Sequence, residues 1–170
     1  MSISKKRGAF VDDNQCNVDE LKTIIQIGLV VSNLDELIEN MRQVFNIDPD
    51  YVENFIYQGV RYRDKPIPAS VRIACYNRFG VQLEFMQPTS TGDNIWTDCL
   101  KENPGKKFIL HHIRFNDVED NDALSKVLIE RGVSVYQEGK SITNPGGKFT
   151  YYDTSNLIGF VIETVTKVSQ

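Results

Sequence analysis

Cysteine is scarce in this sequence, and the few cysteines present are not paired in spacing. Cys16, Cys75 and Cys99 are the only three among 170 residues, and no CxxC motif occurs. An odd, irregular set argues against a disulfide framework or a zinc knuckle. Isolated thiols more often fill space than act as nucleophiles. Since secreted domains of this size often carry disulfides, we expect a reducing, cytoplasmic location.

Long apolar runs and a surplus of positive charge are also missing. No run of about 18 apolar residues is present, so no membrane-spanning helix is expected. The basic start at residues 1–7 lacks the apolar stretch of a secretory signal. The net charge is −4, whereas a general nucleic-acid binder presents a basic face to phosphates. We therefore expect a partner that is neither a membrane nor a nucleic acid.

The first half of the sequence predicts a strand–helix–three-strand module over residues 21–90. The run at 23–31 is apolar and β-branched, as in a buried strand. Between 34 and 45, apolar residues recur at spacings of three and four, which predicts an amphipathic helix. Further strands are predicted at 51–57, 70–76 and 81–86, with a proline-containing loop at 61–69 and a tight hairpin at 77–80.

The second half repeats this order over residues 107–168. A strand is predicted at 108–115, a helix around 124–128 that ends at Gly132, and further strands at 133–136, 149–152 and 160–165. Residues 91–106 form a linker with a short helix, and the polar residues 1–20 form an N-terminal extension. The predicted class is α+β, with two tandem βαβββ modules forming a curved, barrel-like mixed sheet around a metal cavity.

Polar side chains occupy matching positions in the two modules. The last strands read GVQLE at 80–84 and GFVIE at 159–163, so each has a glycine four residues before a glutamate. Aligning the first strands of the two modules places Gln26 and His112 at the same position of the repeat. An internal repeat of this kind predicts a pseudo-twofold structure in which matching residues meet at one site.

Four side chains of this repeat form a candidate metal site: Gln26, Glu84, His112 and Glu163. A carboxylate is costly to bury unless it is paired or bound to a metal. Two carboxylates, an imidazole and an amide together suit one divalent ion such as zinc, nickel, cobalt or manganese. An octahedral ion held by four protein ligands keeps two positions for substrate.

Each of these residues also has a plainer interpretation. Because side chains alternate along a strand, Glu84 or Glu163 could point to solvent, and Gln26 could be a hydrogen-bonded core amide. Adjacent strand residues face opposite ways, so only one of His111 and His112 can enter the cavity. The repeat selects His112, and His111 is then expected behind it. The coincidence of four candidates at two symmetric positions favours the metal site.

Several segments resemble the vicinal-oxygen-chelate (glyoxalase-like) superfamily. These are residues 26–45, VQLEFMQP at 81–88, HHIRF at 111–115, and FTYYDT at 149–154 followed by GFVIE at 159–163. The resemblance covers about residues 21–166. Within the superfamily it is similar to methylmalonyl-CoA epimerase-like and glyoxalase-4-type proteins. It implies the same fold, one divalent metal ion and a homodimer.

The family's four metal ligands fall on Gln26, Glu84, His112 and Glu163. The first ligand is commonly histidine in epimerases and bacterial glyoxalases, so the set with Gln26 is similar to eukaryotic-type glyoxalase I. The second carboxylate base of the epimerases falls on Arg72 or a neighbour. The glutathione-contacting arginine and asparagine of eukaryotic glyoxalase I fall on Val30 and Pro88. The sequence thus departs from both patterns.

The resemblance implies a lyase or isomerase that abstracts a proton next to a metal-chelated carbonyl, lactoylglutathione lyase-like or acyl-CoA epimerase-like. Glu163 and Glu84 are the candidate bases. Arg72, Arg114 and Tyr151 are candidate contacts for an acidic substrate such as an acyl-CoA or a carboxylate.

Two other functions occur on this fold. One is non-catalytic sequestration of a small molecule, as in bleomycin-resistance proteins, which usually lose the ligands and line the cavity with aromatics. The other is ring cleavage by a dioxygenase, which needs two histidines and one carboxylate on iron. Only one histidine belongs to the ligand set here, which disfavours the dioxygenase.

Overall fold

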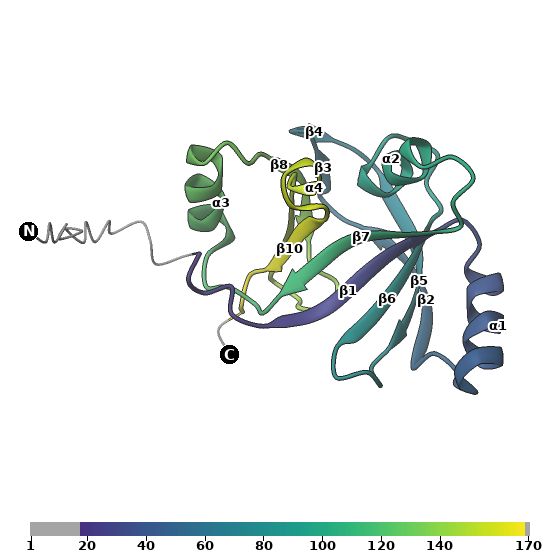
Figure 1. The fold of residues 1–170 in the computed structure, drawn as a ribbon. Helices are drawn as coiled ribbons and strands as arrows, with labels where there is room; N and C mark the ends of the chain where they lie inside the picture. Colours follow the sequence, from purple (N-terminus) through teal and green to yellow (C-terminus); the bar gives the residue numbers. More distant parts are fainter. Residues whose placement is uncertain (1–17, 169–170) are drawn as a thin grey trace, which may run out of the picture.

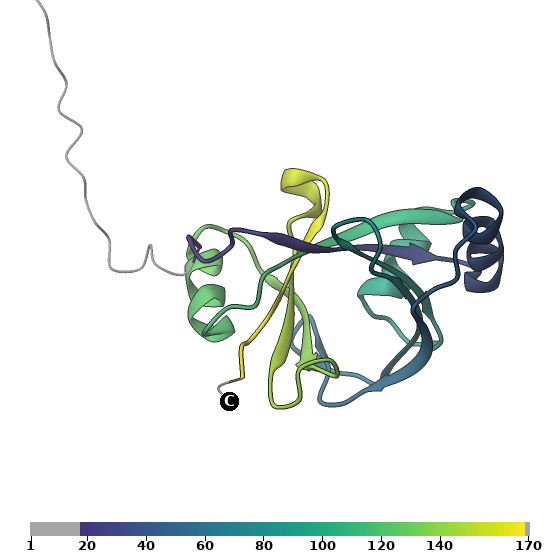
Figure 2. The ribbon, with the colours of Figure 1, turned by 90° about the horizontal axis from the view of Figure 1, so that it is seen from below.

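A single strongly curved sheet of ten strands organises the protein (Figures 1 and 2). The computed structural model describes residues 18–168. The strands follow the order β2-β5-β6-β1-β7-β10-β9-β8-β3-β4. Their bounds are β1 Ile24–Val31, β2 Tyr51–Tyr57, β3 Arg61–Tyr62, β4 Lys65–Pro66, β5 Ala69–Tyr76, β6 Gln82–Pro88, β7 Phe108–Phe115, β8 Val135–Lys140, β9 Lys148–Tyr152 and β10 Val161–Val165. The helices are α1 Leu34–Phe45, α2 Ile95–Glu102, α3 Asn121–Glu130 and α4 Ser155–Ile158.

The two halves of the sheet meet where β1 and β7 pair antiparallel, a pair that we call the central seam. In the first half β1 lies parallel to β6, and in the second half β7 lies parallel to β10. Helices α1 and α3 connect the strands of their own halves and lie at opposite ends of the molecule (Figure 1). The predicted α+β class and curved mixed sheet are confirmed, whereas the module boundaries remain a prediction.

Helix α1 shows how local sequence sets one of these elements. Asn33 caps it, its side chain accepting a hydrogen bond from the Glu36 backbone N–H at 3.1 Å. The helix ends at Asn46, whose φ of 54° is left-handed. Its buried face, Leu34 to Met41, packs on β1, β5 and β6 through Val31, Ala74 and Phe85. This packing covers the convex side of the first half and leaves its concave side to the cavity.

The segment predicted as a loop at 61–69 contains two short strands instead. Strand β3 pairs with β8 of the second half, Arg61 opposite Glu138 and Tyr62 opposite Gln137. A segment of the first half thereby extends the sheet at the second half's edge. Two-residue strands are too short to show a period-two pattern, and their partner lies about 75 residues away, so local sequence gives no signal for them.

Strand β8, helix α4 and the N-terminal segment differ from the elements predicted for them or lie partly outside the described residues. Strand β8 begins and ends later than the predicted 133–136, and the short helix α4 was not predicted. Most of the predicted extension at 1–20, with Cys16, lies outside the described residues. No helix within residues 18–168 is both long enough and apolar enough to cross a membrane.

Candidate active site

The four predicted ligands come together on the four central strands. Gln26 lies on β1, Glu84 on β6, His112 on β7 and Glu163 on β10. Measured from Nε2 of His112, Glu163 Oε2 lies at 3.0 Å, Gln26 Oε1 at 3.3 Å and Glu84 Oε2 at 3.6 Å. Three oxygens from three different strands therefore surround one imidazole nitrogen.

The register of the central seam produces this convergence. Gln26 lies opposite Arg114, and Gly28 lies opposite His112, so a twofold rotation exchanges Gln26 with His112. The His112 ring lies over Gly28, where an added Cβ would be 1.9 Å from the ring's Cε1. Glycine at this position is therefore required for the ring to occupy the seam.

The same rotation relates the two glutamates but gives them different neighbours. Glu84 lies beside Gly28 on the adjacent strand, whereas Glu163 lies beside Arg114. One carboxylate thus has a residue without a side chain next to it, and the other has a guanidinium. The scaffold is symmetric here, but its charges are not.

This difference is reflected in the acidity of the two buried carboxyls. Burial, with a contribution from the charge of Glu163, raises the pKa of Glu84 to about 7, although His112 opposes the rise. Burial would also raise the pKa of Glu163, but His112, Arg114 and the Tyr151 hydroxyl outweigh it and hold that pKa below its ordinary value. Carboxyls whose pKa values are driven apart in this way can take different roles in proton transfer.

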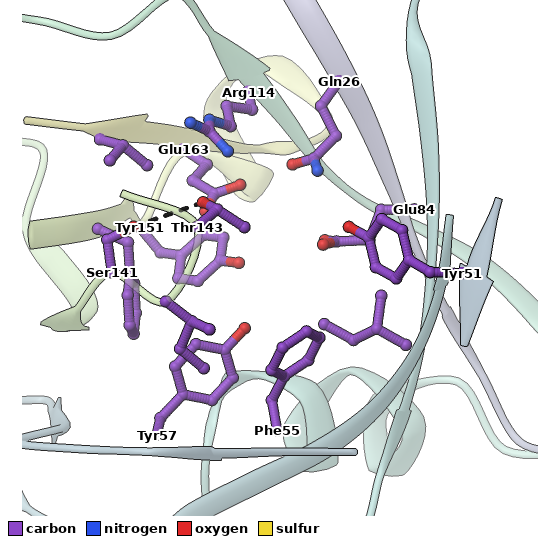
Figure 3. A pocket seen from close by; sticks show the side chains of 14 residues that line it. Gln26, Tyr51, Phe55, Tyr57, Glu84, Arg114, Ser141, Thr143, Tyr151 and Glu163 are labelled. Carbon is purple, nitrogen blue, oxygen red and sulfur yellow. Dashed lines mark hydrogen bonds between the residues drawn. The ribbon is translucent and has the colours of Figure 1, made fainter. Parts of the chain in front are cut away.

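A small, partly open cavity of about 30 Å³ lies against these residues (Figure 3). A space of this size holds roughly two water molecules. Glu84 and Glu163 face each other across it, and Gln26 lies above the gap between them (Figure 3). The remaining lining includes Arg114, the loop 141–143 and the aromatic side chains of Tyr51, Phe55, Tyr57, Phe149 and Tyr151.

Arg114 supplies positive charge at the cavity wall. Its Nη2 donates to Asp117 Oδ1 at 2.9 Å. Although burial opposes it, the charges of Glu163, Asp117 and Glu84 raise the pKa of this guanidinium. One guanidinium is thus surrounded by three acidic side chains, those of Glu163, Asp117 and Glu84, so the local charge favours the binding of a further cation.

Two of the three predicted substrate contacts lie at the cavity, and the third does not. Arg114 and Tyr151 line it. Arg72 instead donates to both carboxylate oxygens of Asp35, beside α1, at 3.0 and 2.8 Å. Because side chains alternate along β5, it is Ile73 that faces the cavity. No carboxylate occupies this strand's cavity-facing position.

The aromatic side chains of β2 were not predicted as part of the site. Tyr51, Phe55 and Tyr57 take three of the four odd positions of this strand, Glu53 being the fourth, while Val52 and Ile56 are exposed. This alternation of aromatic residues at odd positions was a readable signal of an inward-facing side. The loop at 141–143 gave no such signal.

The donor set fits a divalent ion by its chemistry, and one oxygen of each of the other three residues lies within 3.6 Å of His112 Nε2. Ligands bound to one ion at about 2.0–2.2 Å lie roughly 3.0–3.5 Å from each other, close to the measured separations of 3.0, 3.3 and 3.6 Å. Glu163 Oε2 is buried and lacks a hydrogen bond of good geometry within the described part of the chain. No three His, Cys, Asp or Glu side chains of residues 18–168 are already arranged as a metal site. Binding would thus require the carboxylates to turn toward the ion.

Comparison with known proteins relates the chain to one superfamily. Residues 25–151 match the model of the Glyoxalase/Bleomycin resistance protein/Dioxygenase superfamily. No curated protein sequence matches the chain.

Similar solved structures share the fold at low sequence identity. A hypothetical protein from Bacillus halodurans C-125 has a TM-score of 0.62 at 16% identity, over 87% of this chain and 96% of the other. Methylmalonyl-CoA epimerase from Mycobacterium tuberculosis has a TM-score of 0.59 at 16% identity, over 93% and 97%. A Streptomyces coelicolor methylmalonyl-CoA epimerase variant in complex with 2-nitronate-propionyl-CoA has a TM-score of 0.54 at 23% identity, over 88% and 96%.

Proposed function

The chain belongs to the Glyoxalase/Bleomycin resistance protein/Dioxygenase superfamily, as its sequence predicts, and we propose that it is a metal-dependent enzyme of the glyoxalase or epimerase type. It would act as an isomerase or lyase that removes a proton next to a chelated carbonyl. The observation that carries this proposal is the convergence of Gln26, Glu84 and Glu163 on Nε2 of His112. The superfamily includes epimerases and glyoxalases, and its members commonly use a divalent metal.

The metal site of this proposal consists of Gln26, Glu84, His112 and Glu163. Their mixed nitrogen and oxygen donors suit zinc, nickel, cobalt or manganese. A divalent ion held there would supply Lewis-acid chemistry, which would make the proton next to a bound carbonyl more acidic.

The two glutamates handle the proton. Glu163 would remove the proton when it is displaced from the ion. Glu84, which faces it across the cavity (Figure 3), would return a proton from the other side when it is displaced in turn. The residue of β5 that faces the cavity is Ile73, which cannot act as a base. We propose that Glu84 and Glu163 together take the place of the second carboxylate base that the epimerases carry on that strand.

The substrate proposed here is a small acyl-CoA or another carboxylate-bearing carbonyl compound. One structural neighbour was solved with methylmalonyl-CoA, which supports this class. Arg114 offers a charge for a carboxylate, and the aromatic walls keep water from the reacting carbon. Since the cavity of about 30 Å³ admits only a few atoms, any carrier group must remain outside it.

The first experiment measures metal content and proton exchange. Purified protein is loaded with each of the four metals and analysed for bound ion, then incubated in D₂O with methylmalonyl-CoA and with α-hydroxycarbonyl compounds. We expect one ion per chain and deuterium at the carbon next to the carbonyl. Glu163→Gln is expected to slow exchange by about 10²-fold or more, since base catalysis contributes 10²–10⁴-fold. A Glu163→Gln protein that keeps both its metal and full exchange would refute the assigned base.

A second candidate function is sequestration of a small molecule, favoured by the five aromatic side chains at the cavity. Aromatic rings provide a large contact area for a flat apolar ligand, although such a ligand would require the cavity of about 30 Å³ to widen. Two results together would support this function instead. Loading would leave no bound metal, and an aromatic compound would bind tightly, detected by quenching of the fluorescence of the aromatic side chains at the cavity. A homodimer also remains a proposal.

A further inference from the structure

Gln26 differs from the other candidate ligands because only one end of its side-chain amide can bind a cation. The amide oxygen has lone pairs, whereas the NH₂ group carries two hydrogens and repels an ion. Oε1 of Gln26 lies 3.3 Å from Nε2 of His112, so the oxygen is the end that faces the candidate site. The orientation of this amide therefore decides whether Gln26 can serve as a ligand.

The carboxylates of the site would by themselves favour the opposite orientation. Oε2 of Glu84 and Oε2 of Glu163 lie around the same imidazole nitrogen of His112, at 3.6 and 3.0 Å. Both oxygens are acceptors when the carboxyls are ionised, and would attract the NH₂ group of Gln26 into the site. Gln26 is only 4% exposed, so water offers its NH₂ group little in exchange. An acceptor on the outer side of the amide is needed to hold it.

Gln82 on β6 provides this acceptor. Gln26 and Gln82 are direct partners in the parallel pairing of β1 with β6. Nε2 of Gln26 donates to Oε1 of Gln82, and Nε2 of Gln82 donates in turn to Oδ1 of Asn77 at 2.8 Å. Asn77 is anchored in the turn before β6, because its backbone N–H donates to Oδ2 of Asp50 at 2.6 Å. Both glutamine NH₂ groups thus point away from the candidate site.

The repeat in the fold supplies an internal comparison. Val161 on β10 is the strand partner of His112, just as Gln82 on β6 is the strand partner of Gln26. Val161 is buried and apolar, so its side chain forms no hydrogen bond with the imidazole. A polar strand partner therefore accompanies the amide and not the imidazole.

We propose that Gln82 is a positioning residue: it accepts from the NH₂ group of Gln26 and so directs Oε1 of Gln26 toward a bound divalent ion. The proposal rests on the metal site of the proposed function, to which it adds a residue that acts on a ligand rather than on the ion. Groups that orient a metal ligand from behind commonly change metal affinity by about 10–100-fold.

Zinc affinity, measured by chelator competition, tests this role. In Gln82→Leu the acceptor is lost, and zinc binding is expected to weaken roughly 10–100-fold. Gln43→Leu is the matched control, since it makes the same substitution at an exposed position of α1, and it should bind zinc as the wild type does. Thermal unfolding verifies that each variant is folded.

A second background separates orientation of the amide from packing around it. A carboxylate has an oxygen at either end, so in Gln26→Glu the orientation of the side chain no longer matters. Adding Gln82→Leu to this variant should change zinc affinity by less than about threefold, although the same change costs far more beside Gln26. Equal losses in the two backgrounds would show that Gln82 acts through packing and would overturn the proposal.

NMR of the metal-free wild type tests the amide orientation directly. We expect a coupling across the hydrogen bond between Nε2 of Gln26 and Cδ of Gln82, and its absence would overturn the proposal. Wild-type zinc affinity in a folded Gln82→Leu protein would refute the role of Gln82 alone. Failure of the wild type to bind zinc, nickel, cobalt or manganese would refute the proposed metal site, and the role of Gln82 with it.

Discussion

Gly28 shows how much of the site depends on one missing side chain. The His112 ring occupies the space in which a Cβ of residue 28 would lie, 1.9 Å from the ring's Cε1. We expect Gly28→Ala to displace the ring, weaken metal binding roughly 10–100-fold and destabilise the fold by about 1–3 kcal/mol. Chelator competition and thermal unfolding measure the two effects. Gly92→Ala, with no atom within 4 Å of its added Cβ, is the control and should change neither.

Glu84 predicts an unusual dependence of stability on pH in the metal-free protein. Its pKa rises from 4.5 in the reference state to about 7 in the fold, so the fold prefers the protonated form. The resulting stability is present below about pH 4.5 and is lost as pH rises through about 7. Relative to Glu84→Gln, the wild type should lose on the order of 3 kcal/mol of unfolding free energy between pH 5 and 8. Denaturant unfolding at both pH values provides the measurement.

The comparison with Glu84→Gln is needed because His111 acts in the opposite direction. A buried histidine with a lowered pKa destabilises the fold as pH falls below its ordinary value. Both proteins contain His111, so its effect cancels in the difference. Parallel pH profiles for the two proteins would contradict the raised pKa of Glu84.

Symmetry in the sequence identified residues that lie together in the structure, and their role as metal ligands stays a prediction. The internal repeat selected Gln26, Glu84, His112 and Glu163, which the structure brings together. Arg72 had no repeat partner to fix its orientation, and its pairing with Asp35 depends on packing of α1 against β5. The contact between His111 and His112 depends on ring rotation, which the strand pattern does not encode.

At the scale of elements, one carboxylate adds side-chain contacts to the strand pairing that joins the β3–β4 hairpin to the second half. Asp98 of α2 accepts from the Tyr62 hydroxyl and, at 3.4 Å, from the Tyr136 hydroxyl. Its Oδ2 also lies 3.6 Å from Nη2 of Arg63, which stacks over both tyrosine rings. The hairpin therefore depends on a partner that is remote in sequence, which is why its strands could not be predicted locally.

We expect Asp98→Ala to destabilise the protein by about 1–3 kcal/mol, because it leaves two partly buried hydroxyls without their acceptor. Asp93→Ala is the matched control on the same segment. Its ion pair with Lys101 is exposed, so its loss should cost less than about 1 kcal/mol. Thermal unfolding of both variants gives the comparison, and equal losses would show that the hairpin does not depend on Asp98.

At the scale of the whole molecule, the candidate metal ligands come equally from both halves. Gln26 and Glu84 belong to the first half, and His112 and Glu163 to the second. An ion bound by all four would join the halves across the central seam and stabilise the folded state. At 100 times the dissociation constant, the gain is about 2.7 kcal/mol. We expect the melting temperature to rise with added zinc or nickel, to fall again with chelator, and to change little in His112→Ala.

The sequence was also informative at this scale. The apolar periodicities and the repeat together predicted a curved α+β sheet of two similar modules, because each module's core strands are long and regular. The closing hairpin and the small volume of the cavity depend on tertiary packing, so they emerged only from the structure.

The twofold rotation about the central seam exchanges Gly28 with Arg114, and this has a stereochemical consequence. A molecule lying across the seam meets Gly28, covered by the His112 ring, on one side and the Arg114 guanidinium on the other. Turning the molecule end over end does not restore the same contacts, although the strands around it would look alike. If the proposed function holds, a nearly symmetric substrate would therefore meet different groups at its two ends, and the two hydrogens of a prochiral carbon between them would not be equivalent.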